Sequence, residues 1–102
     1  MTINIMGIPY AVKEVPVVDK DAFTMGQINY VSQEILLDET LSSEMKDAVL
    51  LHEILHGICM FIGLDQINED ERAVQQLSAA LYSTFKDEFT SLFEKARTQQ
   101  RA

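Results

Sequence analysis

The sequence predicts one α+β domain, in which a small antiparallel sheet of about three to four strands packs against two helices. In residues 1–38, apolar side chains alternate with polar ones, as they do in strands that bury one face. From residue 42 onward, apolar side chains recur at the spacing of helices. A chain of 102 residues suits a single compact domain, so residues 1–102 are interpreted as one unit.

The predicted strands are short and are separated by turns. Ile3 and Ile5 lie on one face of the first strand, and Gly7 marks the turn after it. Ser32 and Gln33 suit a tight turn before the last strand. The later strands are expected near residues 10–15, 26–31 and 34–38.

The first helix is predicted over residues 42–62. Ser42 can cap its start, and Gly63 suits the position just past its end. From Ala48 to Ile62 the helix is apolar almost all round, which indicates that it is buried.

A second long helix is predicted over residues 68–96, with Asn68 as its cap. Its inner face is expected to be a stripe of apolar side chains at helical spacing. The members of this stripe are Val74, Leu77, Leu81, Phe85, Leu92 and Phe93.

Charge and composition exclude several classes of protein. The formal net charge of -8 would repel a phosphate backbone, so direct binding of nucleic acid is not expected. The single cysteine, Cys59, cannot form an internal disulfide. We interpret Cys59 as a small core residue, with a role as a soft metal ligand as the alternative.

No membrane or export segment is predicted. The N-terminus lacks a basic region followed by a long apolar run, which a signal peptide would have. The longest apolar stretch, residues 48–64, is interrupted by His52, Glu53 and His56. We therefore expect a cytoplasmic location.

The sequence His52-Glu53-Ile54-Leu55-His56 carries the chemistry. His-Glu-x-x-His on a helix is a general pattern of zinc metalloproteases. Residues four apart share a helix face, so both imidazoles can reach one zinc ion at about 2.0–2.1 Å. Glu53 would lie beside the metal and act as the general base that accepts a proton from zinc-bound water.

The surroundings of this motif strengthen the interpretation. Between Ala48 and Ile62, His52, Glu53 and His56 are the polar side chains of a helix that is otherwise apolar. Unpaired polar groups are costly to bury, and a bound cation would explain all three together. The alternative is two core histidines that donate to backbone carbonyls, with Glu53 at the surface.

A third ligand of another type is needed, because a catalytic zinc usually has three protein ligands and the chain has two histidines. Glu71 is the preferred candidate, since it lies in the first turn of the next helix. Asn68 and Glu71 also have the spacing of a capping box, so Glu71 could instead satisfy the start of that helix. Glu69, Asp70 and Asp65 remain alternatives as ligands.

Three stretches of the chain resemble the ImmA/IrrE family of gluzincin-like metallopeptidases, which are common in bacteria, phages and mobile elements. The first stretch, from Gly26 to Leu37, resembles the sheet segment before the family's active-site helix. The second is Leu50-Leu51-His52-Glu53-Ile54-Leu55-His56-Gly57-Ile58, and the third begins Glu71-Arg72-Ala73-Val74. The likeness covers roughly residues 26–81.

The resemblance implies a zincin-like fold, bound zinc and hydrolysis of peptide bonds in a protein substrate, often a DNA-binding repressor. Two other functions remain open. One is a non-catalytic zinc module that sequesters a protein partner, and the other is a metal-free interaction domain. Tyr82 and Tyr30 are weaker candidates to assist catalysis, because core packing accounts for both.

Overall fold

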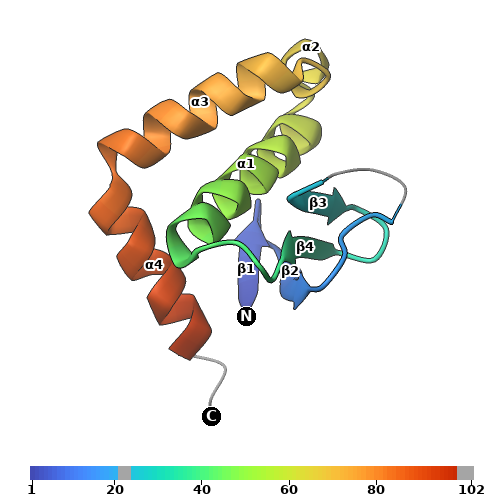
Figure 1. Ribbon diagram of the computed structural model, residues 1–102. Coiled ribbons are helices and arrows are strands. Elements are labelled where there is room, and N and C mark those ends of the chain that lie inside the picture. The colour runs from blue at the N-terminus through green and yellow to red at the C-terminus, as the bar shows by residue number, and fades with distance from the viewer. Residues whose placement is uncertain (21–23, 99–102) are drawn as a thin grey trace.

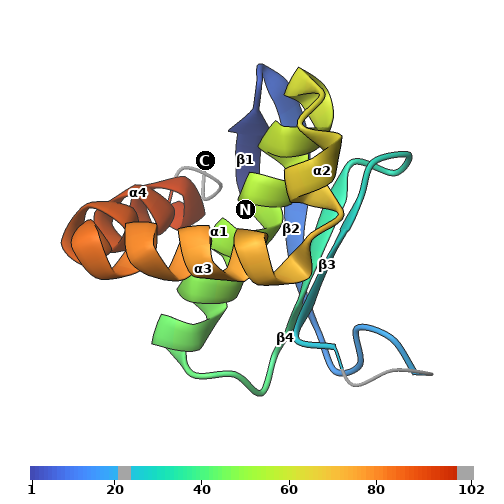
Figure 2. The same cartoon turned by 90° about the horizontal axis from the view of Figure 1, so that it is seen from above.

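The computed structural model describes residues 1–20 and 24–98, which form four strands and four helices. Helix α1 lies between the sheet and α3, and α4 returns toward the edge of the sheet at β1 (Figures 1 and 2). The α+β class is therefore confirmed. The elements are β1 (Thr2–Ile5), β2 (Ile8–Val15), β3 (Gly26–Asn29), β4 (Glu34–Asp38), α1 (Ser43–Ile62), α2 (Asp65–Asn68), α3 (Glu71–Thr84) and α4 (Lys86–Thr98).

The sheet is mixed rather than wholly antiparallel. Its strand order is β1-β2-β4-β3, and β2 pairs with β4 in parallel while the other two pairings are antiparallel. The most apolar of the later strands takes the interior position, because β4 buries both Ile35 and Leu37 almost completely. Strand β3 is left at an edge of the sheet.

Both antiparallel connections use residues with positive φ. Met6 and Gly7 have φ of 52° and 81°, the conformation of a two-residue hairpin turn between β1 and β2. Gln33 has φ of 56° before β4, and the Asn29 side chain accepts hydrogen bonds from two backbone N–H groups of that turn. The predicted turns at Gly7 and at Ser32-Gln33 are therefore confirmed.

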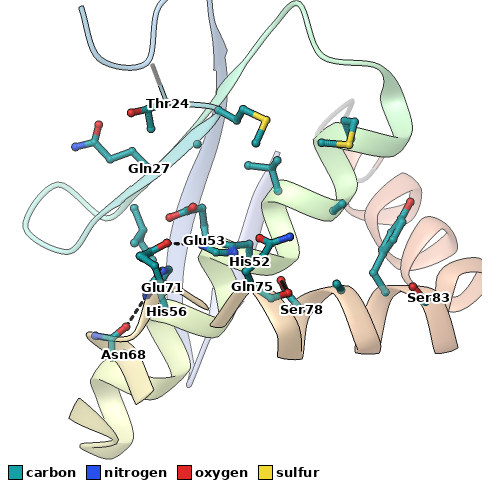
Figure 3. Close-up of a pocket in the computed structure, with 18 of the residues that line it drawn as sticks. Thr24, Gln27, His52, Glu53, His56, Asn68, Glu71, Gln75, Ser78 and Ser83 are labelled. Carbon is teal, nitrogen blue, oxygen red and sulfur yellow. Dashed lines mark hydrogen bonds and ion pairs between the residues drawn. The ribbon is translucent and has the colours of Figure 1, made fainter. Parts of the chain in front are cut away.

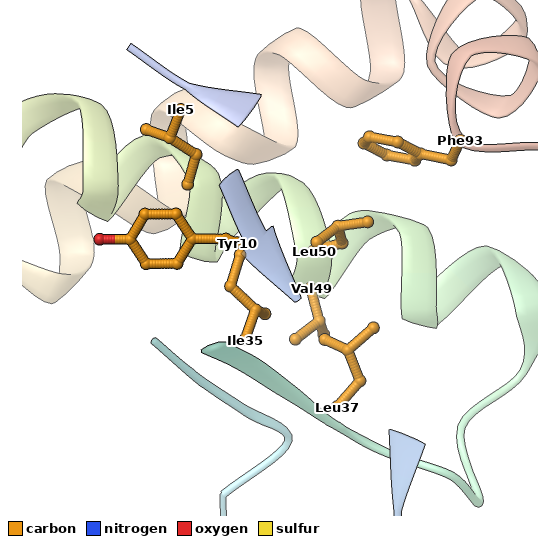
Figure 4. Close-up of a cluster of buried hydrophobic side chains, with 7 residues drawn as sticks. All are labelled: Ile5, Tyr10, Ile35, Leu37, Val49, Leu50 and Phe93. Carbon is orange, nitrogen blue, oxygen red and sulfur yellow. The ribbon is translucent and has the colours of Figure 1, made fainter. Parts of the chain in front are cut away.

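The core lies between the inner face of the sheet and α1, with α4 closing one end (Figure 4). Tyr10 and Phe93 are its largest fully buried side chains. The arrangement fixes α1 on the sheet, so the residues on the opposite side of α1 face α3. The buried cluster consists of Ile5, Tyr10, Ile35, Leu37, Val49, Leu50 and Phe93.

Helix α1 begins and ends where its caps predict. The Ser42 hydroxyl accepts a hydrogen bond from the backbone N–H of Met45 at 3.2 Å, and Gly63 has a left-handed φ of 77°. The expectation of burial up to Ile62 is wrong for the last turn, where Ile62 is 52% exposed. Cys59, one turn earlier, is buried as expected of a core residue.

The second long helix is broken into separate pieces. Asn68 is the last residue of α2 and does not cap α3, because the Asp70 carboxylate accepts from the backbone N–H of Ala73 at 3.1 Å. Helix α3 ends at Thr84, and the chain turns sharply into α4 (Figure 1). The predicted stripe is not buried as a whole, because Val74 and Phe93 are buried while Leu77, Phe85 and Leu92 are exposed.

Helix α4 is held against α1 by an ion pair. The Arg97 guanidinium donates to the Asp47 carboxylate at 2.7 Å, and Asp47 is 4% exposed. Because Asp47 lies in the first half of α1, this contact helps to hold α4 against that part of the helix. None of the helices in residues 1–20 and 24–98 is both long enough and apolar enough to cross a membrane.

Gly26 allows β3 to approach α1 closely. A Cβ atom at position 26 would overlap Val49 Cγ1 and would lie 3.4 Å from Glu53 Oε2. We expect Gly26→Ala to lower the free energy of unfolding by about 1–3 kcal/mol through overpacking. Urea unfolding measures this change, and adding Val49→Ala should recover part of the loss by opening space. Strictly additive effects of the two substitutions would contradict the close approach.

Candidate metal centre

His52 and His56 lie on successive turns of α1 and present their rings to the same side. The two ring centroids are 4.9 Å apart. Glu71, the first residue of α3, places one carboxylate oxygen 2.6 Å from His56 Nε2 and the other 3.2 Å from His52 Nε2. The three side chains therefore converge on one point between α1 and α3 (Figure 3).

The geometry of these three residues fits a metal ion. One ligand atom from each residue lies within 4.8 Å of the other two. Ligands at 2.0–2.1 Å from a tetrahedral zinc are about 3.3 Å apart, so Glu71 would need to withdraw slightly from His56 to admit the ion. The Glu71 carboxylate bridges the two imidazoles, and a cation placed between the three groups would be held by donor types that zinc prefers.

The other acidic residues considered as third ligands do not join this group. Among residues 1–20 and 24–98, the ligand atoms of His52, His56 and Glu71 lie close enough together to hold one metal ion. Asp70 instead caps α3, and this also removes the capping-box role from Glu71. That these three residues bind a metal remains a prediction.

Glu53 lies beside the three converging side chains but does not belong to their group. It is 7% exposed, lines the same cavity, and stands between the sheet edge and α1 near Gly26. The alternative that places Glu53 at the surface is therefore wrong. Burial raises the pKa of Glu53 to about 7, with a smaller raising effect of the Glu71 carboxylate and an opposing effect of His56.

The raised pKa of Glu53 predicts a pH dependence of stability for the metal-free protein. Between about pH 4.5 and 7 the folded protein retains a proton on Glu53 that the unfolded chain has released. The free energy of unfolding should therefore fall as the pH rises through this window, by about 2–3 kcal/mol. Denaturant unfolding in the presence of a chelator at pH 5 and 7.5 measures it. Glu53→Gln should remove this component, and an unchanged slope would contradict it.

Asn68 is a site residue that sequence reasoning interpreted as a helix cap. Its side-chain oxygen lies 2.6 Å from His56 Nδ1, the ring nitrogen that faces away from Glu71 (Figure 3). Burial raises the pKa of the Tyr30 hydroxyl, and the Asn68 side chain beside it has a smaller lowering effect. The contact joins residues from two helices, and the only sequence signal for it is an amide shortly before the third candidate ligand.

A cavity of about 720 Å³ runs past these residues. Its walls come from the segment that leads into β3, from α1 and from the inner face of α3. The end near the start of α1 is lined mainly by apolar and small side chains, and Ser83 marks its far limit (Figure 3). These side chains are Met25, Met45, Ala48, Val49, Ser78, Ala79 and Tyr82.

The two tyrosines considered as helpers both line this cavity. The Tyr82 hydroxyl is buried and has no hydrogen-bond partner within the part of the chain that the structure describes. Tyr30 packs its ring against Phe61 with 6.3 Å between centroids. Neither tyrosine contacts the three converging side chains through a hydrogen bond that the structure records for residues 1–20 and 24–98.

No model of a protein family matches this chain, and no curated protein or solved structure is significantly similar to it. The resemblance to the ImmA/IrrE metallopeptidases therefore remains a prediction from motifs.

Proposed function

We propose that the protein is a zinc metallopeptidase in which His52, His56 and Glu71 hold the metal and Glu53 is the general base. One observation carries the proposal. A buried carboxylate, Glu53, adjoins a cluster of three ligand-type side chains without joining it, and all four line one cavity. A purely structural zinc site has no need for such a carboxylate.

The division of roles follows from the chemistry of each group. Zinc in this position would act as a Lewis acid, which lowers the pKa of a bound water toward about 7 and polarises a carbonyl. Glu53 would serve as the group that takes up a proton from the attacking water and delivers it to the leaving amine.

The position of β3 suggests how a peptide would lie. Strand β3 is an edge strand, and Thr24, Gly26 and Ile28 line the cavity that holds the site. An extended peptide could pair with this edge and bring a carbonyl past His52 and Glu53. In the part of the chain that is described, the cavity wall has no charged side chain apart from the site residues, so it suits a segment with apolar or uncharged side chains.

A library of unstructured peptides, incubated with the zinc-loaded protein and analysed by mass spectrometry, tests the proposal. We expect new N-termini at preferred sites, and we expect their loss when a zinc chelator is added. Intact peptides at every zinc concentration would contradict the proposal. A transcriptional repressor is a candidate substrate on the strength of the resemblance alone, and a cytoplasmic location is part of this proposal.

The second candidate is a non-catalytic zinc module that sequesters a protein. The observation in its favour is a set of exposed apolar side chains on α3, on α4 and between them. Leu77, Phe85 and Leu92 are each about half exposed. Under this alternative, a partner would bind with fixed stoichiometry and stay intact. Glu53→Gln would then bind it as well as the wild type does.

A further inference from the structure

His56 has a hydrogen-bond acceptor on the side of its ring that faces away from the site. Its Nε2 faces Glu71, and its Nδ1 lies 2.6 Å from Asn68 Oδ1. If Nε2 binds a metal, Nδ1 must carry the ring proton, because a neutral imidazole has one N–H. Asn68 Oδ1 is then placed to accept that proton and to fix the orientation of the ring.

A second residue, Tyr30, lines the same cavity beside Asn68. Because Oδ1 faces His56, the amide nitrogen is the group left to interact with the Tyr30 hydroxyl. Tyr30 follows the last residue of β3, the edge strand that lines the cavity. The end of the edge strand, a residue of α2 and a histidine of α1 therefore lie next to one another at this point.

We propose that Asn68 is a positioning residue for the metal centre, and that Tyr30 holds Asn68 in the orientation that this role needs. The proposal rests on the proposed function, since it assigns His56 as a ligand. Partners of this kind, which hydrogen bond to a ligating histidine, typically change metal affinity by 10–100-fold. The proposal also assigns a role to the four-residue helix α2, which places Asn68 beside His56.

The two histidines differ in this respect. His52 Nδ1 is buried and has no hydrogen-bond partner in residues 1–20 and 24–98. The orientation of His52 is thus set by packing, whereas His56 has a dedicated polar partner. Changes at Asn68 should consequently act on the metal through His56 alone.

Zinc affinity, measured by competition with a fluorescent chelator, tests the proposal without any need for proteolysis. We expect Asn68→Leu, which has a similar shape and no acceptor, to weaken zinc binding about 10–100-fold. Asn68→Asp should stay close to the wild type, because a carboxylate can also accept the proton from Nδ1. The cobalt-substituted protein should show an altered visible absorption spectrum in Asn68→Leu and an unaltered one in Asn68→Asp.

Tyr30→Phe tests the second link. We expect it to weaken zinc binding less than Asn68→Leu does, and to have no further effect when Asn68 is already leucine. Wild-type zinc affinity in Asn68→Leu, equal losses in Asn68→Leu and Asn68→Asp, or additive effects of Tyr30→Phe would each overturn the proposal. A wild-type protein that binds no zinc would overturn the proposed function as well, so the two failures are distinguishable.

Discussion

Glu53→Gln is expected to abolish peptide hydrolysis while zinc remains bound. Glutamine keeps the shape of the buried side chain but cannot accept a proton, and a general acid–base group contributes about 10²–10⁴-fold to a rate. Glu53 does not belong to the cluster of His52, His56 and Glu71, so its substitution should leave the metal content at the wild-type level. The loss should appear in kcat, since the proton transfer occurs in the chemical step.

Cleavage of a peptide found in the library, followed with equal zinc content in both proteins, measures this effect. Glu69→Gln is a matched control, because Glu69 lies outside the metal-ligand group and is exposed. The control should cleave at the wild-type rate. Residual cleavage by Glu53→Gln at more than about one tenth of that rate would show that another group acts as the base.

The second large effect is expected from removal of Glu71. A ligand that binds only the folded state stabilises it, and zinc at 1,000 times its dissociation constant would add about 4 kcal/mol. For a domain of this size that corresponds to a rise of roughly 15–30 °C in the melting temperature. Glu71→Ala should remove most of this rise, and its zinc affinity should fall by more than the roughly 100-fold that loss of an outer partner causes.

Calorimetry of the zinc-loaded and chelator-treated proteins measures the shift. Glu69→Ala is the matched control, since it also removes a carboxylate near the start of α3 but from outside the ligand cluster. We expect Glu69→Ala to show the full rise. If Glu71→Ala were stabilised by zinc as strongly as the control, Glu71 would have no place among the ligands.

Features encoded within a few residues could be predicted from the sequence. The ends of α1 depend on Ser42 and Gly63, which act on the backbone next to them. The convergence of His52 and His56 follows from the geometry of one helix turn. The turn at Gly7 likewise follows from residues that tolerate a positive φ.

Features that depend on distant contacts could not be predicted in this way. The parallel pairing of β2 with β4 joins strands that are not consecutive in the chain, and alternation within each strand does not reveal which strands become neighbours. After the bend that follows α3, Phe93 packs in the core and Arg97 pairs with Asp47, and both contacts join residues far apart in the sequence.

The start of α3 shows how local rules can compete. Asn68, Glu69 and Asp70 include two residue types that favour the capping position, and Asn68 also had the spacing of a capping box with Glu71. In the structure Asp70 caps α3, whereas Asn68, the last residue of α2, contacts His56 of α1. That contact lies between residues 12 apart, so the pattern around Asn68 could not indicate it.

X-ray absorption at the zinc edge of the purified, zinc-loaded protein would show which side chains bind the metal. We expect two imidazole ligands and a carboxylate oxygen, with the nearest atoms about 2.0–2.2 Å from zinc. Replacing His56 with alanine should remove one imidazole from the spectrum. A sulfur atom at about 2.3 Å, which would implicate Cys59, or a spectrum of fully hydrated zinc would contradict this ligand set.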